Sequence, residues 1–204
     1  MKKLLAFALV AMMAGVSFGA WGFYDADRSW VVLDDGSGPA GYSLWDSGAG
    51  MFQGADLGTF DLTMDSFTLT GFDTKTYKNG SSDVTGTEYF YTIYTGTRPV
   101  SPTFTSLGGG WLRDLGGGNQ TWGATGLTVD LLAGLSAGTS YTLEIYGLIT
   151  GTDPVDTLYD NNNNAPANYT ATFDTAPAAI PEPATMSLLG LGALAMVLRR
   201  KISK

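Results

Sequence analysis

The chain lacks two residue types that carry much of protein chemistry: none of its 204 residues is cysteine or histidine. Without cysteine there is no disulfide framework and no thiol nucleophile, so packing or bound ions must stabilise the fold. Without histidine, the commonest general base and the commonest transition-metal ligand are missing. Paired carboxylates, or an unusual Ser/Lys or Asp/Tyr arrangement, are the remaining practical routes to catalysis.

Basic charge is scarce as well. Between residues 20 and 178, sixteen Asp and two Glu face five Lys or Arg, a net charge of −13, whereas the whole chain carries −8. Such a surface repels nucleic acid and anionic lipid, and it suits a soluble extracellular protein. Aromatic residues make up 12% of the chain, which is enough for a packed core and excludes a disordered chain.

The first twenty residues, MKKLLAFALVAMMAGVSFGA, have the order of a secretory signal: two lysines, an apolar stretch, then small residues. Ser17 and Gly19 stand three and one positions before a cut, which predicts a signal peptide over residues 1–19. The alternative is a retained membrane anchor. The apolar run argues against it, because it is shorter than the roughly 20 residues that span a bilayer.

The C-terminal end differs from the rest of the chain. Residues 184–198 carry no charge, and as a helix they would cover about 22 Å of a bilayer core near 30 Å. The basic tail, residues 199–204, begins with Arg199, Arg200 and Lys201. These side chains can snorkel, which extends the reach of a short transmembrane helix, and they predict that the tail stays cytoplasmic.

A short motif precedes this apolar run. Pro181 and Pro183 hold Glu182 in an extended, accessible segment. Together the Pro-Glu-Pro motif, the apolar run and the basic tail resemble a PEP-CTERM sorting signal, here residues 177–204. The resemblance implies recognition by an exosortase, a membrane-embedded protease of Gram-negative bacteria that make extracellular polysaccharide. A chance Pro-Glu-Pro beside an ordinary anchor helix is the alternative.

The same resemblance implies a route. The secretion machinery would export the chain, the tail would anchor it transiently in the inner membrane, and the exosortase would cut near Pro-Glu-Pro. The product would then reach the cell surface or the exterior.

The body, residues 20–176, has a hydrophobic period of two. Alternating runs of apolar and polar residues occupy 60–64, 66–72, 141–147 and 169–173. Residues 88–94 are apolar or aromatic on both faces, which predicts a central, covered strand. Turn signals include Asn79-Gly80 and the glycine triplets at 108–110 and 116–118. We therefore expect an all-β fold, an antiparallel β-sandwich of about eight to ten strands, followed by a linker at 175–179.

Catalysis by carboxylates would need two acidic groups at a defined separation. Glu88 and Glu144 are the only glutamates of the body. In a strand, the Glu144 side chain points to the side opposite Leu143 and Ile145, which predicts that it lies on a solvated outer surface. No hydrolase, phosphate-loop or metalloprotease motif is present, so we expect no enzyme; a glycosidase-like protein is the distant alternative.

Two tryptophans predict a sugar-binding platform. Trp111 follows a glycine triplet, and Trp122 follows a loop with Asn119 and Gln120. Exposed rings can stack on sugars while amide side chains bond hydroxyl groups. The alternative is that both rings close the end of the core, where large aromatics contribute most burial.

A weak calcium site is the remaining candidate. Asp153, Asp156 and Asp160 offer the hard oxygen ligands that Ca²⁺ takes. Aspartate is also an ordinary turn residue, and no EF-hand pattern is present. No other metal and no cofactor is expected.

Taken together, the sequence predicts an exported, exosortase-sorted protein with a structural or adhesive role in a polysaccharide-rich envelope or biofilm matrix. The alternative function is a carbohydrate-binding module. Extracellular polysaccharide is the expected partner besides the exosortase, and nucleic acid is excluded.

Overall fold

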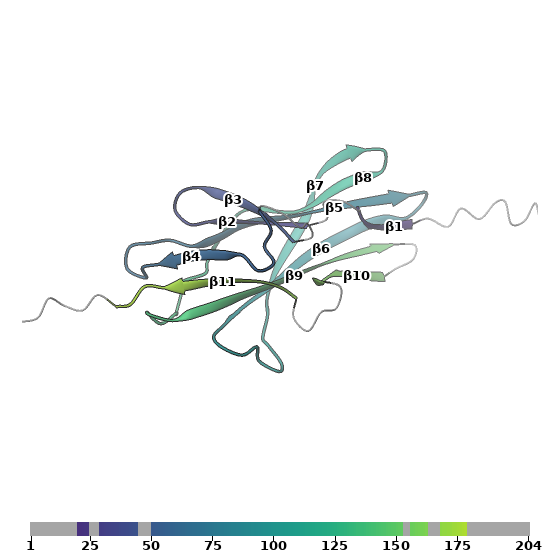
Figure 1. Cartoon of the computed structure of the whole chain (residues 1–204). Coiled ribbons are helices and arrows are strands. Elements are labelled where there is room, and N and C mark those ends of the chain that lie inside the picture. Colours follow the sequence, from purple (N-terminus) through teal and green to yellow (C-terminus); the bar gives the residue numbers. More distant parts are fainter. Residues whose placement is uncertain (1–19, 25–28, 45–49, 153–155, 163–167, 179–204) are drawn as a thin grey trace, which may run out of the picture.

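The computed structural model describes residues 20–24, 29–44, 50–152, 156–162 and 168–178. These residues form eleven β-strands and no helix (Figure 1), which confirms the all-β class. The strands are β1 Ala20–Phe23, β2 Ser29–Asp34, β3 Pro39–Ser43, β4 Asp56–Phe60, β5 Thr68–Asn79, β6 Asp83–Tyr94, β7 Thr105–Gly116, β8 Asn119–Asp130, β9 Ser140–Thr152, β10 Asp156–Asp160 and β11 Tyr169–Thr175.

The strands belong to one curled sheet rather than to two separate sheets. Its order is β3-β2-β5-β8-β7-β6-β9-β11-β4, with β1 added on β5 and β10 added on β9. The sheet is mixed, because β11 pairs with β4 in parallel while the other pairs of these strands are antiparallel. The two-sheet antiparallel sandwich expected from the sequence is therefore replaced by a continuous, curled arrangement.

Strand β7 explains why the sheet is continuous. Its first half pairs with β6 and its second half with β8, so it joins the two layers seen in Figure 1. The glycine triplet at 108–110 lies inside this strand, whereas the sequence suggested a turn. At Gly109 a Cβ atom would lie 2.6 Å from Thr87 Cγ2 and 2.9 Å from Phe72 Cε2. Only glycine fits at this position, so Gly109 serves close packing inside a strand, and the triplet does not reverse the chain.

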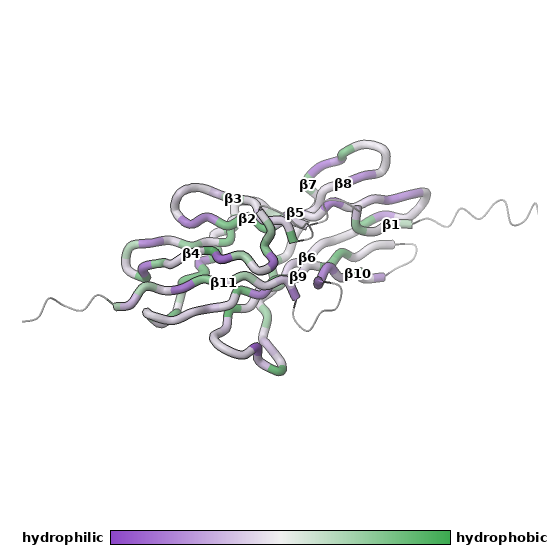
Figure 2. Tube along the Cα trace, viewed as in Figure 1, coloured by the Kyte–Doolittle hydropathy of each residue, from purple (hydrophilic) through white to green (hydrophobic). Residues whose placement is uncertain are grey.

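The core lies inside the curl and is built from aromatic rings. Phe60 and Phe67 stack with centroids 4.4 Å apart, and Phe173 meets Phe67 edge-on at 5.3 Å. Phe72 and Tyr89 stack at 4.1 Å. Apolar and polar residues mix along the strands (Figure 2), as the period of two predicted. These stacked rings account for a stable core without disulfides.

The body incorporates its N-terminal residues from Ala20 onward. Trp21 is only 7% exposed and packs in a second cluster with Val84 and Ile149. Its ring lies directly on Gly151, where a Cβ would approach Trp21 Cε2 to 2.2 Å. The predicted signal peptide, residues 1–19, lies outside the described residues.

The body also holds its C-terminal end tightly. Thr175 is buried, the Ala176 amide donates to the Phe60 carbonyl at 2.8 Å, and the Gly138 amide donates to the Ala176 carbonyl at 3.0 Å. The linker expected at 175–179 is therefore wrong for its first two residues, which belong to the fold. The start of β1 and the end of β11 lie at opposite ends of the molecule (Figure 1).

Candidate functional site

The structure places the two tryptophans of the predicted sugar platform side by side, but Trp122 and Gln120 make contacts within the body. Trp111 on β7 and Trp122 on β8 are directly opposed in the register. Trp122 packs against the Trp21 cluster, and its Nε1 donates to Gln120 Oε1 at 3.0 Å. Gln120 is only 6% exposed, whereas Trp111 is 54% exposed. Trp111 therefore offers the more open ring of the pair. Asn119, the remaining member of the predicted platform, lies at the start of β8. Sugar binding by these residues stays a prediction.

Glu144 is not on a solvated surface, as the sequence suggested, but is fully buried. Arg98, from the segment between β6 and β7, binds it through two contacts: Nε to Oε2 at 2.8 Å and Nη2 to Oε1 at 2.7 Å. The Asn168 side-chain amide donates to Oε1 at 2.7 Å. Burial raises the pKa of Glu144, but these donors outweigh it and the pKa is lowered. Glu144 is thus an ionised anchor for two loops, with both oxygens occupied.

The two glutamates do not face each other at a catalytic separation. Glu88 on β6 lies opposite Leu148, and Thr92 lies opposite Glu144. Four residues along β9 separate the two positions, which is about 13 Å at the usual strand rise. Glycosidases need carboxyl groups about 5 Å or roughly 6.5–9.5 Å apart. This pair does not match that geometry.

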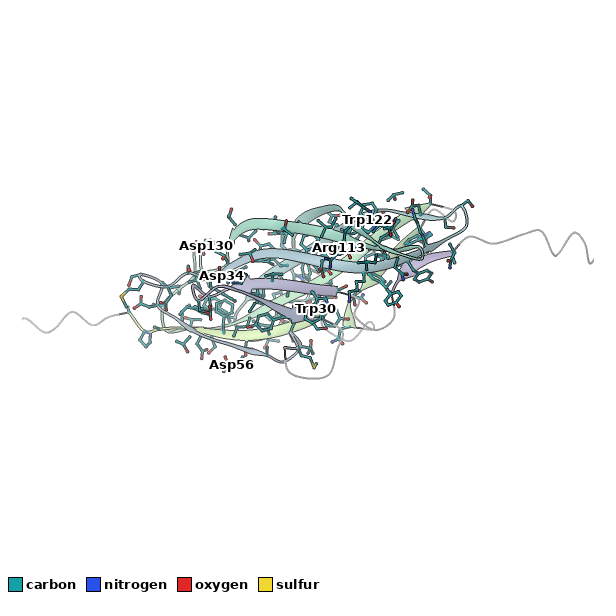
Figure 3. All side chains as sticks on the ribbon, turned by 90° about the horizontal axis from the view of Figure 1, so that it is seen from above. Trp30, Asp34, Asp56, Arg113, Trp122 and Asp130 are labelled. Carbon is teal, nitrogen blue, oxygen red and sulfur yellow. The ribbon has the colours of Figure 1, made fainter. Side chains whose placement is uncertain are left out.

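The outer face of β2, β5, β8 and β7 carries a cluster that the sequence did not reveal; we call it the Trp30 face. Its members are Trp30, Asp73, Lys75, Arg113 and Thr121. Trp30 lies opposite Asp73, and Lys75 lies opposite Thr121, which in turn lies opposite Arg113. Figure 3 shows Trp30 and Arg113 toward the middle of this layer. Side chains from four strands thus meet on one surface.

Electrostatics on the Trp30 face are unusual for this acidic body. Burial raises the pKa of Asp73, while the nearby cations Arg113 and Lys75 act in the opposite direction. Asp73 Oδ1 is buried without a hydrogen-bond partner. Thr121 is only 1% exposed, and its Oγ1 also lacks a partner. Buried polar atoms are normally satisfied, so these two oxygens are candidates for a contact from outside the protein.

Two of the three calcium candidates lie in the described residues, and they stand apart from each other. Asp153 lies outside the described residues. Asp156 and Asp160 stand at the two ends of β10, about 13 Å apart by strand rise, and Asp160 Oδ1 accepts the Tyr169 hydroxyl at 2.5 Å. In the part of the chain that the structure describes, no three acidic side chains converge as metal ligands. Calcium binding stays a prediction.

The sorting tail follows directly on the described body. Pro181, Glu182 and Pro183, the apolar run and the basic residues 199–201 all lie outside the described residues. Within residues 20–178, leaving aside the gaps, there is no helix with the length and apolar character to cross a membrane.

Comparison with known proteins identifies this tail. Residues 179–201 match the PEP-CTERM protein-sorting motif, which confirms the resemblance drawn from the sequence. The match implies recognition by an exosortase and an exported protein whose precursor is anchored in a membrane. No curated protein matches the chain significantly.

Proposed function

We propose that this chain, whose C-terminus carries a PEP-CTERM sorting motif, is a surface or extracellular-matrix protein with a non-enzymatic structural or adhesive role in a polysaccharide-rich envelope. The observation that carries the proposal is where the motif begins. The match starts at residue 179, three residues after the hydrogen bonds that hold Ala176 to the body. A cut near Pro-Glu-Pro would therefore remove the anchor and leave every strand of the body in place.

The polar groups of the body support a non-enzymatic role. Glu144 is occupied by Arg98 and Asn168, and Glu88 lies too far from it to act as its partner. The sequence contains no histidine or cysteine to replace them. The two glutamates of the body therefore do not supply the paired carboxylates that glycoside cleavage needs.

The experiment that tests this proposal locates the body on intact cells. The native chain and a variant in which Pro181, Glu182 and Pro183 are all changed to Ala are expressed in a host with an active exosortase, and surface exposure is measured by labelling with a membrane-impermeant amine reagent. The native body should be labelled and found at the surface or in the medium, and the variant should stay with the membrane fraction. Equal distribution of the two proteins would contradict the proposal.

A further inference from the structure

We propose that the Trp30 face binds a neutral polysaccharide, with Trp30 as the stacking ring and Asp73 and Arg113 as the principal contacts to hydroxyl groups. This inference concerns a ligand of the folded body. It does not depend on how the tail is processed, so it stands or falls separately from the proposed function.

Trp30 is a ring held outside the core on a rigid strand. Its neighbours Ser29 and Val31 are fully buried on the inner side of β2, so strand alternation places Trp30 on the outer side, where it is partly exposed. Beside it on β3 stands Gly41, where a Cβ would lie 3.6 Å from Trp30 Cε3. Any larger residue there would cover part of the ring. An indole held in this way presents an apolar surface that fits the C–H face of a pyranose.

Two glycines follow Asp73 in this row of the sheet. In the register Trp30 lies opposite Asp73, Asp73 opposite Gly123, and Gly123 opposite Gly110. The two glycines place no side chain beyond Asp73 in this row. Gly110 is exposed whereas Gly123 is buried, so the open part of this row that a sugar ring can reach lies beside Trp30 and Asp73.

Two polar oxygens of the face are left without a protein partner. Asp73 Oδ1 and Thr121 Oγ1 are buried and have no hydrogen-bond partner. Arg113 lies near enough to Asp73 to influence its pKa, yet no ion pair joins the two side chains in the described structure. A sugar hydroxyl can donate to a carboxylate and accept from a guanidinium, and a vicinal diol can do both at once. A ligand with two adjacent hydroxyl groups therefore matches the carboxylate acceptor of Asp73 and the guanidinium donor of Arg113.

The distribution of basic residues singles out this face. The five basic residues of the body are Arg28, Lys75, Lys78, Arg98 and Arg113. Lys78 pairs with Asp83 and Arg98 with Glu144, and Arg28 lies outside the described residues. The other two, Lys75 and Arg113, both act on Asp73. The body as a whole carries −13, which repels a polyanion, so the favoured ligand is a neutral glycan.

Affinity electrophoresis tests the proposal with the full-length protein, purified in a detergent without a sugar headgroup. Native gels contain dextran, a mannan or a galactan as neutral polysaccharides, or polygalacturonate as a polyanion. We expect at least one neutral polysaccharide to retard the protein. Trp30→Ala should weaken this binding at least tenfold, and Asp73→Asn at least fivefold. Tyr159→Ala, which removes an exposed ring on β10 outside both candidate sugar-binding surfaces, is the matched control and should bind like the native chain.

Gly41→Leu keeps the test independent of any loss of folding. Gly41 lies on the edge strand β3 and does not have a left-handed backbone conformation, so leucine fits there without strain. It should cover the Trp30 ring and weaken binding at least tenfold while the thermal transition stays that of the native protein. Three results would overturn the proposal: no retardation by any neutral polysaccharide, retardation by polygalacturonate alone, or binding that Trp111→Ala abolishes and Gly41→Leu leaves intact.

Discussion

Arg98 and Glu144, 46 residues apart in the sequence, form a two-point ion pair with contacts of 2.8 and 2.7 Å. The carboxylate is fully buried, whereas the Arg98 side chain is 30% exposed. Asn168 completes the cluster from the residues just before β11. This pair holds two loops of the outer surface against the central strands β6 and β9.

Removing Arg98 should destabilise the body more than removing the whole pair. Arg98→Met leaves a buried carboxylate without its cation, so the free energy of unfolding should fall by about 2–3 kcal/mol, less than for a fully buried pair because Arg98 is partly exposed. The double variant Arg98→Met/Glu144→Leu removes both charges and should recover most of this loss. Urea denaturation of the three proteins measures it. A double variant less stable than Arg98→Met would contradict the account.

Glu144 and Asp73, whose pKa values shift in opposite directions, predict opposite responses of stability to pH. The pKa of Glu144 is lowered in the fold, so its stabilising contribution is present above its unfolded pKa and is lost as the pH falls through the folded pKa. The pKa of Asp73 is raised, so its ionisation destabilises the fold as the pH rises above its unfolded pKa.

Asp73→Asn should therefore stabilise the body at neutral pH. The gain over the native protein should vanish below about pH 3.9, where Asp73 is protonated in both states, and should grow as the pH rises until the folded group has ionised. Urea denaturation between pH 3 and 8 measures this difference. A gain that does not change with pH would show that charge is not its cause.

The glycine triplet inside β7 offers a matched set of substitutions. Gly109→Ala places a methyl group within 3 Å of Thr87 and Phe72, and overpacking of this kind lowers the free energy of unfolding by about 1–3 kcal/mol. Gly108 and Gly110 have nothing within 4 Å of an added Cβ, so alanine there should change stability by about 0.5 kcal/mol or less. Thermal unfolding of the three variants distinguishes the positions; equal effects at all three would contradict the role given to Gly109.

Trp21 should be essential for the stability of β1, the first strand of the body. Its ring packs on Gly151 and against Val84 and Ile149, so Trp21→Ala should lower the free energy of unfolding by about 3–5 kcal/mol. Trp111→Ala, at an exposed ring, should have a much smaller effect. Chemical denaturation followed by far-UV circular dichroism makes the comparison. A small effect at Trp21 would mean that β1 is not a stable part of the body.

Local pattern was sufficient to predict much of the fold. Alternation located parts of β5, β9 and β11, and the doubly apolar run at 88–94 identified β6 as a central strand between β7 and β9. The run at 60–64 was misleading. Strand β4 ends at Phe60, and Asp61 accepts the Thr63 amide at 2.8 Å, a local hydrogen bond that turns the chain.

Long-range pairing explains what the sequence could not predict. Glu144 has the alternation of an exposed residue, and only the return of Arg98 and Asn168 from distant segments buries it. The Trp30 face depends on the register of four strands, which no local pattern specifies. The same holds for the single curled sheet, because the glycines at 108–110 have the composition of a turn but lie in a strand between two layers.

The most direct test of the central claim is the intact mass of the protein recovered from outside the cell, in hosts with an active and with an inactivated exosortase. The account predicts a product that begins near Ala20 and ends near Pro181–Pro183 in the first host, and no such product in the second. A protein that retains Arg199 to Lys204 in both hosts would contradict exosortase sorting and would leave the body tethered to the membrane.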